Sequence, residues 1–257
     1  MDDVTEVSQL ILHERRSRDR GWWSHMRECL AVDAAVRLSW FRGSGADFVA
    51  ASREMAARGD GAAHTLGPPA VDVLGARAVV EVAAAIHMRS ELDGVEVDLT
   101  SHTRLLYRAE RRTGRWVIVS LDPIYERDNL LPSVPGTHLD IDPDALARAR
   151  PTYRMLTHLL NARGYPIADD LYGDDRPAPV QRLYRSLFDW LGPRADLSPA
   201  TAARGHQEEP SPAQSVTGQQ GDPVRENFSP WPDQAEREEC ECLADHTEGD
   251  RQATPQR

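Results

Sequence analysis

Hydrophobic residues in the first sixty positions recur at helical spacing. Between Val4 and Ile11 they lie three or four positions apart with polar residues between them, which is typical of an amphipathic helix. Ser44, followed three residues later by Asp47, is a typical helix start, and Gly59 is a typical end. The predicted elements are helices over residues 4–19 and 22–30, a short strand over 36–41 and a helix over 44–59.

Beyond residue 59 the pattern changes to the alternation of β-strands. From Val95 to Arg108, apolar residues occupy one face and mainly charged or hydroxyl-bearing residues the other, which predicts a strand with one buried face. Pairs such as Asp93-Gly94 and Thr113-Gly114 indicate tight turns. Four antiparallel strands are predicted, over residues 64–73, 76–89, 95–110 and 115–126. Helices followed by long strands indicate an α+β fold with a curved sheet packed on helices.

The remainder of the chain divides into two parts. Helices are predicted to begin at Asp142-Pro143 and to cover residues 151–163 and 179–191, and we expect them to pack on the first part. From Gly192 onward Pro, Gly, Gln, Ser, Glu and Asp dominate, which predicts a disordered tail. The expected organisation is an α+β body over 1–132, a helical extension over 133–191 and an acidic disordered tail over 192–257.

Charge and composition exclude several classes of partner. The 257 residues include 30 basic and 41 acidic ones, and the net charge of -11 argues against nucleic acid or an anionic membrane as a partner. No apolar run approaches a membrane span, and the acidic start MDDVTEVSQL is unlike a signal peptide, so we expect a cytoplasmic protein. Arginines between residues 15 and 20 alternate with Glu14 and Asp19, and we interpret them as a solvated helix face.

The sequence predicts neither a metal site nor a cofactor. Cys29 stands alone in the body, so no disulfide framework is available there. Cys240, Cys242 and His246 lack the paired spacing of a structural zinc site. The chain also has no glycine-rich loop of the kind that binds phosphate.

Residues 22–48 form the stretch from which we expect one pocket wall to be built. It contains Asp33 in a turn, a strand ending in Trp40 and Phe41, and a freshly capped helix. An acidic residue beside an apolar strand with aromatics is typical of such a wall. We therefore place Asp33 in a pocket, with Trp22, Trp40 and Phe41 as substrate-binding residues.

Several segments together resemble one known family. They are AVDAAVRLSWFRGSGADFVAASREM, HTLGPP, LDGVEVDLTSHTRLLYR and RWVIVSLDPIYERDNLLP, within residues 4–132. They look like SnoaL-like members of the nuclear transport factor 2 (NTF2)-like superfamily. The resemblance implies a cone-shaped α+β barrel, in which a curved mixed sheet surrounds a largely apolar cavity roofed by N-terminal helices, and a homodimer formed through the outer sheet face. Members include cyclases, isomerases, dehydratases and accessory subunits without an active site, so the fold alone does not decide the reaction.

The same resemblance implies three catalytic positions, namely Asp33, His64 and His87. An Asp and a His converging on a substrate in a dry cavity serve proton abstraction next to a carbonyl, or loss of water. Each also has a structural interpretation. In that interpretation Asp33 caps a turn, and His64 is a strand-end histidine bonded to backbone. His87, which shares a strand face with Glu81, then points outward.

Tyr107 and Tyr125 are candidate hydrogen-bond donors to a substrate carbonyl, although large aromatics on such strands are also typical of a core. The leading hypothesis is a cofactor-free lyase, isomerase or cyclase that acts on a hydrophobic polyketide- or steroid-like molecule. The alternative is a non-catalytic ligand-binding or accessory subunit whose cavity is filled by side chains. A cavity of several hundred Å³, roughly 300 Å³ or more, that reaches Asp33 would favour the enzyme.

Overall fold

The computed structural model describes residues 2–193, all within one compact unit. The chain begins with helices α1 (Asp3–Asp19), α2 (Trp23–Cys29) and, after two short strands, α3 (Gly45–Ala57). The Asp2 side chain accepts the Thr5 backbone N–H at 2.8 Å and caps α1. Ser44 accepts the Asp47 N–H at 3.1 Å and caps α3 as the sequence predicts. The predicted tail beyond Pro193 lies outside the described residues.

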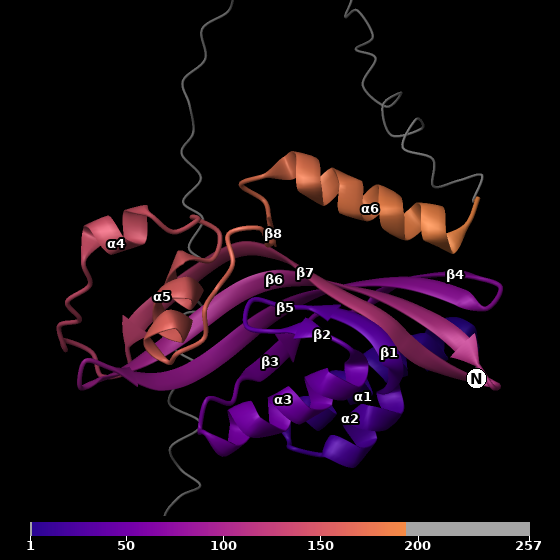
Figure 1. The fold of residues 1–257 in the computed structure, drawn as a ribbon, viewed down its shortest axis with the longest axis horizontal. Coiled ribbons are helices and arrows are strands. Elements are labelled where there is room, and N and C mark those ends of the chain that lie inside the picture. The colour runs from indigo at the N-terminus through magenta and orange to yellow at the C-terminus, as the bar shows by residue number, and fades with distance from the viewer. Residues whose placement is uncertain (1, 194–257) are drawn as a thin grey trace, which may run out of the picture. The chain divides into compact units, whose positions relative to one another are not determined.

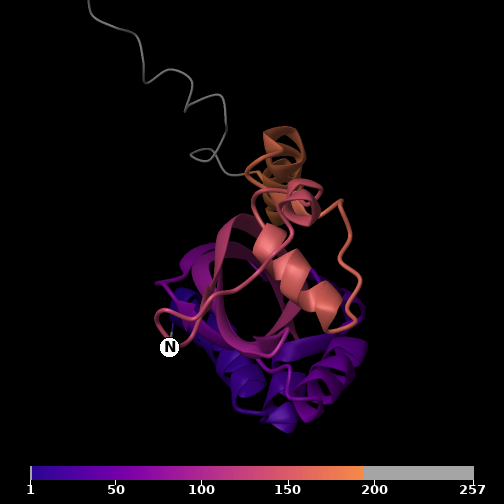
Figure 2. The same ribbon diagram turned by 90° about the vertical axis from the view of Figure 1, so that its left-hand side faces the viewer.

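One mixed sheet carries all the strands found between residues 2 and 193, and it is strongly curved (Figures 1 and 2). Along its main path the order is β2-β1-β7-β6-β5-β3, with β4 paired to β5 and β8 paired to β7. The strands are β1 (Leu30–Arg37), β2 (Arg42–Gly43), β3 (Ala63–Leu66), β4 (Ala70–Leu74), β5 (Arg77–Leu92), β6 (Val95–Arg112), β7 (Arg115–Pro132) and β8 (Tyr172–Gly173). Asp93-Gly94 and Thr113-Gly114 all have positive φ and join the long strands, as predicted.

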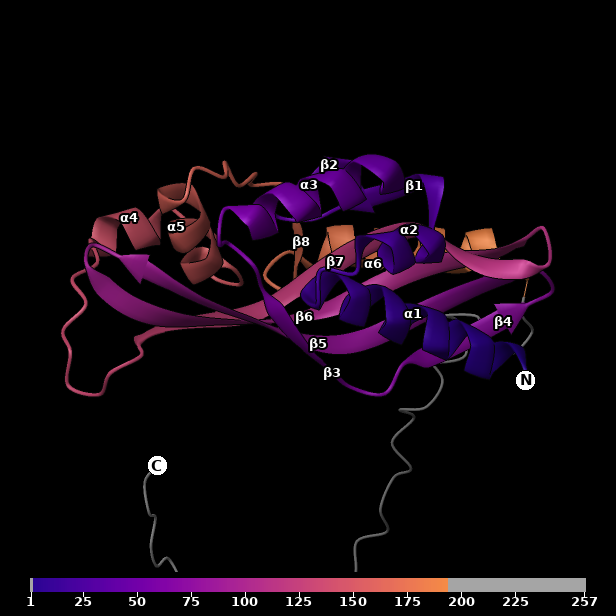
Figure 3. The ribbon, with the colours of Figure 1, turned by 90° about the horizontal axis from the view of Figure 1, so that it is seen from below.

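The sheet has an inner face covered by the N-terminal helices and an outer face. Helices α1, α2 and α3 lie together on the inner face (Figure 3). Register shifts between β6 and β7 at His102/Thr103 and at Arg108/Ala109 are β-bulges, which bend and twist the sheet. These elements form the curved mixed sheet on N-terminal helices that the α+β prediction describes.

Three strand predictions were inaccurate. The strand predicted over residues 115–126 continues to Pro132, where it still pairs with β6. The predicted strand over residues 36–41 instead covers Leu30–Arg37, because this stretch pairs in parallel with β7, placing Leu30 opposite Ile118 and Val36 opposite Leu121. The predicted strand over 64–73 is two strands, β3 and β4. Gly67-Pro68-Pro69 separates them, since proline has no N–H to donate to a strand ladder.

The extension after β7 packs on the α+β body. It contains α4 (Pro143–Ala147), α5 (Arg154–Ala162), β8 and α6 (Pro177–Leu191). Helix α5 is fixed at both ends, because Asp128 accepts the Leu156 N–H at 2.8 Å, and Arg163 donates to the buried Asp60 at 2.6 Å. Its leucines join a core cluster with Met55 and Met88.

Helix α6 covers part of the outer sheet face, opposite the N-terminal helices (Figure 1). Its buried Leu183 and Leu187 pack with Val79, Leu106 and Ile124, which are themselves buried. Farther along, the outer face carries polar side chains, among them Thr65, His87, Thr100 and Arg104. The chain's own helix therefore occupies the apolar part of the face through which a homodimer was expected.

Candidate functional site

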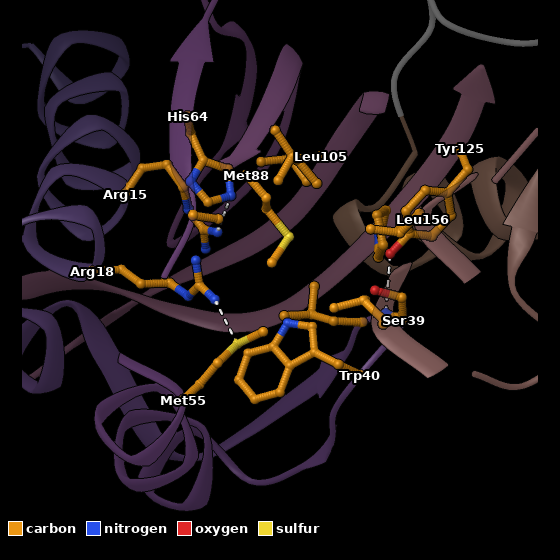
Figure 4. A pocket seen from close by; sticks show the side chains of 15 residues that line it. Arg15, Arg18, Ser39, Trp40, Met55, His64, Met88, Leu105, Tyr125 and Leu156 are labelled. Atoms are coloured by element: carbon orange, nitrogen blue, oxygen red, sulfur yellow. Dashed lines mark hydrogen bonds between the residues drawn. The ribbon is translucent and has the colours of Figure 1, made fainter. Parts of the chain in front are cut away.

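The structure has a mostly apolar cavity on the inner side of the sheet, between α1 and α5. Trp40, Met55, Met88, Leu105, Leu156 and Leu160 form much of its wall, and Arg15, Arg18, Ser39, His64 and Tyr125 bring polar groups to it (Figure 4). The volume open to a water-sized molecule is about 30 Å³. This is room for about two waters, since one needs about 10–15 Å³ by this measure. The cavity is thus far smaller than expected for the enzyme hypothesis, and Asp33 does not line it.

Asp33 lies on the surface, which contradicts its expected place in the pocket. Its side chain is 71% exposed, and its Oδ1 accepts a hydrogen bond from Arg112 Nη1 at 2.7 Å. Strand β1 turns Ala34 and Val36 into the core, so the position of Asp33 faces out. The Arg112 guanidinium beside Asp33 lowers the pKa of that carboxyl. We therefore assign Asp33 to a surface ion pair.

His87 and Trp22 also lie outside the cavity. His87 is exposed on the outer sheet face, where its ring nitrogens contact the hydroxyls of Thr65 at 3.2 Å and Thr100 at 3.3 Å. The alternation along β5 puts Met88, its neighbour, inside instead. Trp22 precedes α2, is 45% exposed and stacks edge-on with His25 rather than binding in a pocket. The catalytic interpretation of His87 and the substrate-binding role of Trp22 therefore do not fit the structure, whereas the alternative that His87 points outward is confirmed.

The other predicted aromatics divide between cavity wall and core. Trp40 lines the cavity, while Phe41 packs behind it against Phe48, with ring centroids 5.4 Å apart. Tyr107 is fully buried in the core, and burial raises its pKa. Tyr125 lines the cavity, and its hydroxyl accepts the Ser39 N–H at 3.0 Å. Burial raises the pKa of Tyr125 to about 12, so its hydroxyl stays protonated at neutral pH.

Part of the charged stretch at the end of α1 is buried, so its interpretation as a solvated face holds for Arg16 and Arg20 and is wrong for the rest. Glu14, Arg15 and Arg18 are only 0%, 2% and 9% exposed. Arg15 donates to the Glu14 carboxylate through Nε at 3.0 Å and through Nη2 at 2.8 Å. The signal was present in the sequence, because residues 14, 15 and 18 continue at helical spacing the face of Val7 and Ile11, which is buried.

His64 lies where β3 meets α1, and its ring is bonded on both sides. Asp19 Oδ1 lies 2.7 Å from His64 Nδ1, and Asp19 Oδ2 accepts the His64 backbone N–H at 2.7 Å. On the other side, Arg15 Nη1 lies 3.4 Å from His64 Nε2. Because a guanidinium only donates, this contact requires a lone pair on Nε2. The proton of neutral His64 is therefore on Nδ1, directed at Asp19.

The surroundings keep His64 neutral and Asp19 ionised. Burial lowers the pKa of His64 to about 4; Asp19 opposes this shift, and the charges of Arg15 and Arg18 add to it. Burial alone would raise the pKa of Asp19, but the hydrogen bonds from His64 and the charge of Arg15 outweigh it and hold that pKa below its usual value. The pair thus joins a carboxylate to an uncharged imidazole in a cavity wall.

A second hollow adjoins the same pair from outside. It has a volume of about 310 Å³ and is lined by Arg15, Asp19 and His64 together with Leu12, Arg16, Arg20 and Leu66. The side chain of Asp19 is 16% exposed, against 3% for His64. Asp19, Arg15 and His64 therefore separate the inner cavity from this outer hollow.

Across residues 2–193, no three His, Cys, Asp or Glu side chains gather in a way that could hold a metal ion. The predicted exclusion of Cys240, Cys242 and His246 concerns residues outside this range. None of the helices between residues 2 and 193 has the length and apolar character needed to cross a membrane.

A family profile and several known proteins match this chain. The sequence profile of the SnoaL-like domain matches residues 1–122. The uncharacterized protein AN9274 of Emericella nidulans is 30% identical over 189 residues, covering 68% of this chain and 79% of that protein. Pea pathogenicity protein 2 of Fusarium vanettenii is 28% identical over 183 residues, covering 69% of this chain and 78% of its own.

Among solved structures, the chain is similar to an NTF2-like protein with a cystatin-like fold from Novosphingobium aromaticivorans. The two share 23% sequence identity at a TM-score of 0.38, over 47% of this chain and 80% of the other. The profile match ends at residue 122, whereas Tyr125, Leu156 and Leu160 of the cavity wall lie beyond it. Residues after the family domain thus complete the cavity.

Proposed function

Because this chain belongs to the SnoaL-like domain family, we propose that it is a cofactor-independent lyase or isomerase that moves a proton on a hydrophobic, polyketide- or steroid-like carbonyl compound. The proposal rests on the placement of His64 in the cavity wall and on its contact with Asp19. Its side chain is 3% exposed, it lines the cavity, and Asp19 holds its Nδ1 at 2.7 Å. A carboxylate that fixes the tautomer leaves Nε2 as a base.

In this mechanism Arg15 Nη1, which lies 3.4 Å from His64 Nε2 in the resting structure, gives way to the substrate. The lone pair of Nε2 then takes a proton from the carbon next to the carbonyl. Asp19 holds the imidazole in place and stabilises the imidazolium that forms, so it acts as a positioning residue. Tyr125 lies at the other end of the cavity (Figure 4). Its hydroxyl oxygen already accepts the Ser39 N–H, so its own hydrogen is free to bond the substrate carbonyl. Asp33, Trp22 and His87 have no part in this mechanism.

Binding of such a substrate requires the cavity to widen beyond its volume of about 30 Å³. Helix α5 is bonded at both ends, to Asp128 and to Asp60. Met55 and Met88 are unbranched thioether side chains that can change rotamer readily. We infer that these two methionines move to admit the substrate.

The outer hollow supports proton exchange during turnover. Asp19 borders this hollow and is the more exposed member of the pair. Water in the hollow can reach the Asp19–His64 pair without entering the apolar cavity. A proton taken by His64 can therefore be exchanged with solvent while the substrate stays enclosed.

The narrow cavity favours a second candidate function, the non-catalytic ligand-binding or accessory subunit. At about 30 Å³ the space is nearly filled by side chains. In that case the Asp19–His64 pair only joins α1 to β3. The two candidates differ in whether His64 transfers a proton.

Deuterium incorporation from solvent tests the enzyme directly. The wild type is incubated in D2O with a panel of hydrophobic ketones and β-hydroxy ketones, and label next to the carbonyl is measured by mass spectrometry. We expect catalysed incorporation for at least one compound, its loss in His64→Ala, and its retention in His87→Gln, where the histidine is exposed on the outer face. Equal incorporation by wild type and His64→Ala, or none above buffer for the whole panel, would favour the accessory function.

A further inference from the structure

We propose that Arg18 binds the carboxylate of the ligand, so that the molecules taken into the cavity are hydrophobic acids. The inference deepens the proposed function by naming the substrate class of the same cavity, and it rests on that cavity being a binding site. Arg18 comes from α1 and lines the cavity beside Arg15 and His64 (Figure 4).

Arg18 is a buried cation whose hydrogen-bonding capacity is almost unused. It is 9% exposed, and no Asp or Glu among residues 2–193 makes an ion pair with it within 4.0 Å. Its Nη2 contacts Met55 Sδ at 3.8 Å, which is a weak acceptor, and its buried Nε has no hydrogen-bond partner within the described chain. A guanidinium has five N–H groups, so most of its donors remain available.

Arg15, on the same helix, is a buried arginine whose charge and hydrogen-bond donors do have a partner. Its guanidinium makes three hydrogen bonds to the Glu14 carboxylate, and that carboxylate is fully buried with it. The charge of Arg15 thus has a partner in contact, whereas that of Arg18 does not. Asp19, the next carboxylate, is held by His64.

Stacking accounts for the position of Arg18 only in part. Its guanidinium carbon lies 5.4 Å from the Trp40 ring centroid and 5.9 Å from that of Phe48, and such cation–π contacts offset some of the cost of burial. Among residues 2–193 they leave the N–H groups in the guanidinium plane with Met55 Sδ as their one, weak acceptor. Burying an unpaired charge is costly unless something compensates for it. A carboxylate in the cavity supplies both the charge and two acceptor oxygens in the geometry that arginine prefers.

The rest of the cavity suits the body of such a ligand. Trp40, Met55, Met88 and Leu105 offer apolar surface next to Arg18. Burial lowers the pKa of Arg18 to about 10, so it stays charged at neutral pH. The charge of Arg18 also lowers the pKa of His64. An anion bound to Arg18 therefore raises the pKa of His64 and makes it a stronger base when the ligand is present.

Matched acids and amides test the proposal by calorimetry. The probes are naphthalene-2-carboxylate with naphthalene-2-carboxamide, and decanoate with decanamide, so that the members of each pair differ in charge but little in shape. We expect at least one acid to bind the wild type about ten-fold or more tightly than its amide, as a charge-assisted contact implies. Arg18→Gln should reduce this ratio to near one. Arg16→Gln, which removes an exposed cation from the same helix, should keep it.

The imidazole resonances of His64 give a second readout. Binding of the acid should raise the pKa of His64, while the amide should leave it unchanged. Arg18→Met, which keeps an unbranched apolar side chain and removes the charge, replaces Arg18→Gln if the latter does not fold. Equal binding of acid and amide by the wild type, an acid preference retained without Arg18, or no binding by either acid would overturn the proposal.

The test separates this proposal from the proposed reaction. His64→Ala should keep the acid preference and lose deuterium incorporation. If the acid preference is absent while His64-dependent incorporation persists, the ligand class is wrong and the reaction stands. If acids bind through Arg18 and no deuterium is incorporated, the binding site is confirmed and the proposed reaction is wrong.

Discussion

Asp19 and His64, 45 residues apart, are joined by two contacts of 2.7 Å, one through the imidazole Nδ1 and one through the His64 backbone N–H. The two carboxylate oxygens are thereby both used, and the last residue of α1 is tied to β3. The backbone contact fixes the position of the His64 main chain, and the Nδ1 contact fixes the rotamer of its imidazole. His64 is therefore held in one orientation. That orientation directs Nε2 toward Arg15.

We predict that acidification destabilises the fold through His64. In the folded protein the pKa of His64 is about 4, against 6.5 as its ordinary value. The unfolded chain therefore binds a proton between these values that the folded chain does not. Stability is fully present above pH 6.5 and falls as the pH drops toward 4, by on the order of 3 kcal/mol. Urea unfolding at several pH values measures the slope.

Comparing two histidine variants in that experiment isolates the contribution of His64 to the pH dependence of stability. His64→Gln should flatten the wild-type slope between pH 6.5 and 4, whereas His87→Gln should keep it, because His87 is exposed on the sheet surface. The lowered pKa of Asp19 acts at lower pH, below its ordinary 3.8, and in the same direction. A wild-type slope preserved in His64→Gln would contradict the assignment.

Removing one charge of the buried Glu14–Arg15 pair should destabilise the fold strongly, whereas replacing both charged residues by apolar ones should not. Glu14→Gln leaves the 2% exposed Arg15 without its countercharge, and we expect a loss of about 3–5 kcal/mol in the free energy of unfolding. Glu14→Leu combined with Arg15→Met removes both charges and should recover most of that loss. Urea denaturation gives both values. Glu28→Gln, at an exposed position of α2, is the control and should change stability by less than about 0.5 kcal/mol.

Asp33→Asn should leave both ligand binding and deuterium incorporation at wild-type levels. Its side chain is 71% exposed, and its partner Arg112 is also on the surface. Exposed ion pairs contribute little to stability, so the melting temperature should be unchanged. Loss of incorporation in Asp33→Asn, with stability intact, would return Asp33 to the site. Asp19→Asn, measured beside it, should lose activity.

Helix α6 should prevent self-association through the outer sheet face. Leu183→Asp combined with Leu187→Asp places two charges against Val79, Leu106 and Ile124 and should release the helix. The uncovered apolar patch then predicts concentration-dependent association in analytical ultracentrifugation. Arg185→Asp, on the exposed side of α6, is the control and should sediment as the wild type. A wild-type dimer that survives the double substitution would place the interface elsewhere.

Local sequence determined much of the fold. The Ser44 cap, the turns at Asp93-Gly94 and Thr113-Gly114, and the alternation along β6 were all readable because each depends on residues a few positions apart. The family resemblance supplied the curved sheet and its inner cavity. Strand β1 was misplaced because its partner residues in β7 lie about 85 positions further along the chain, and parallel pairing of that kind has no local signal.

The tertiary structure decided which charged residues form the site. Asp33 and Asp19 are equally acidic in the sequence, yet the direction of β1 sends one to the surface, and the end of α1 brings the other to His64. It likewise left Arg18 in the cavity without an ion-pair partner among residues 2–193, and it placed α6 over the outer face. The sequence determines which segments favour helix or strand and which face of each element is buried. Contacts between distant elements depend on how the bulged sheet curves, and only the folded chain fixes that curvature.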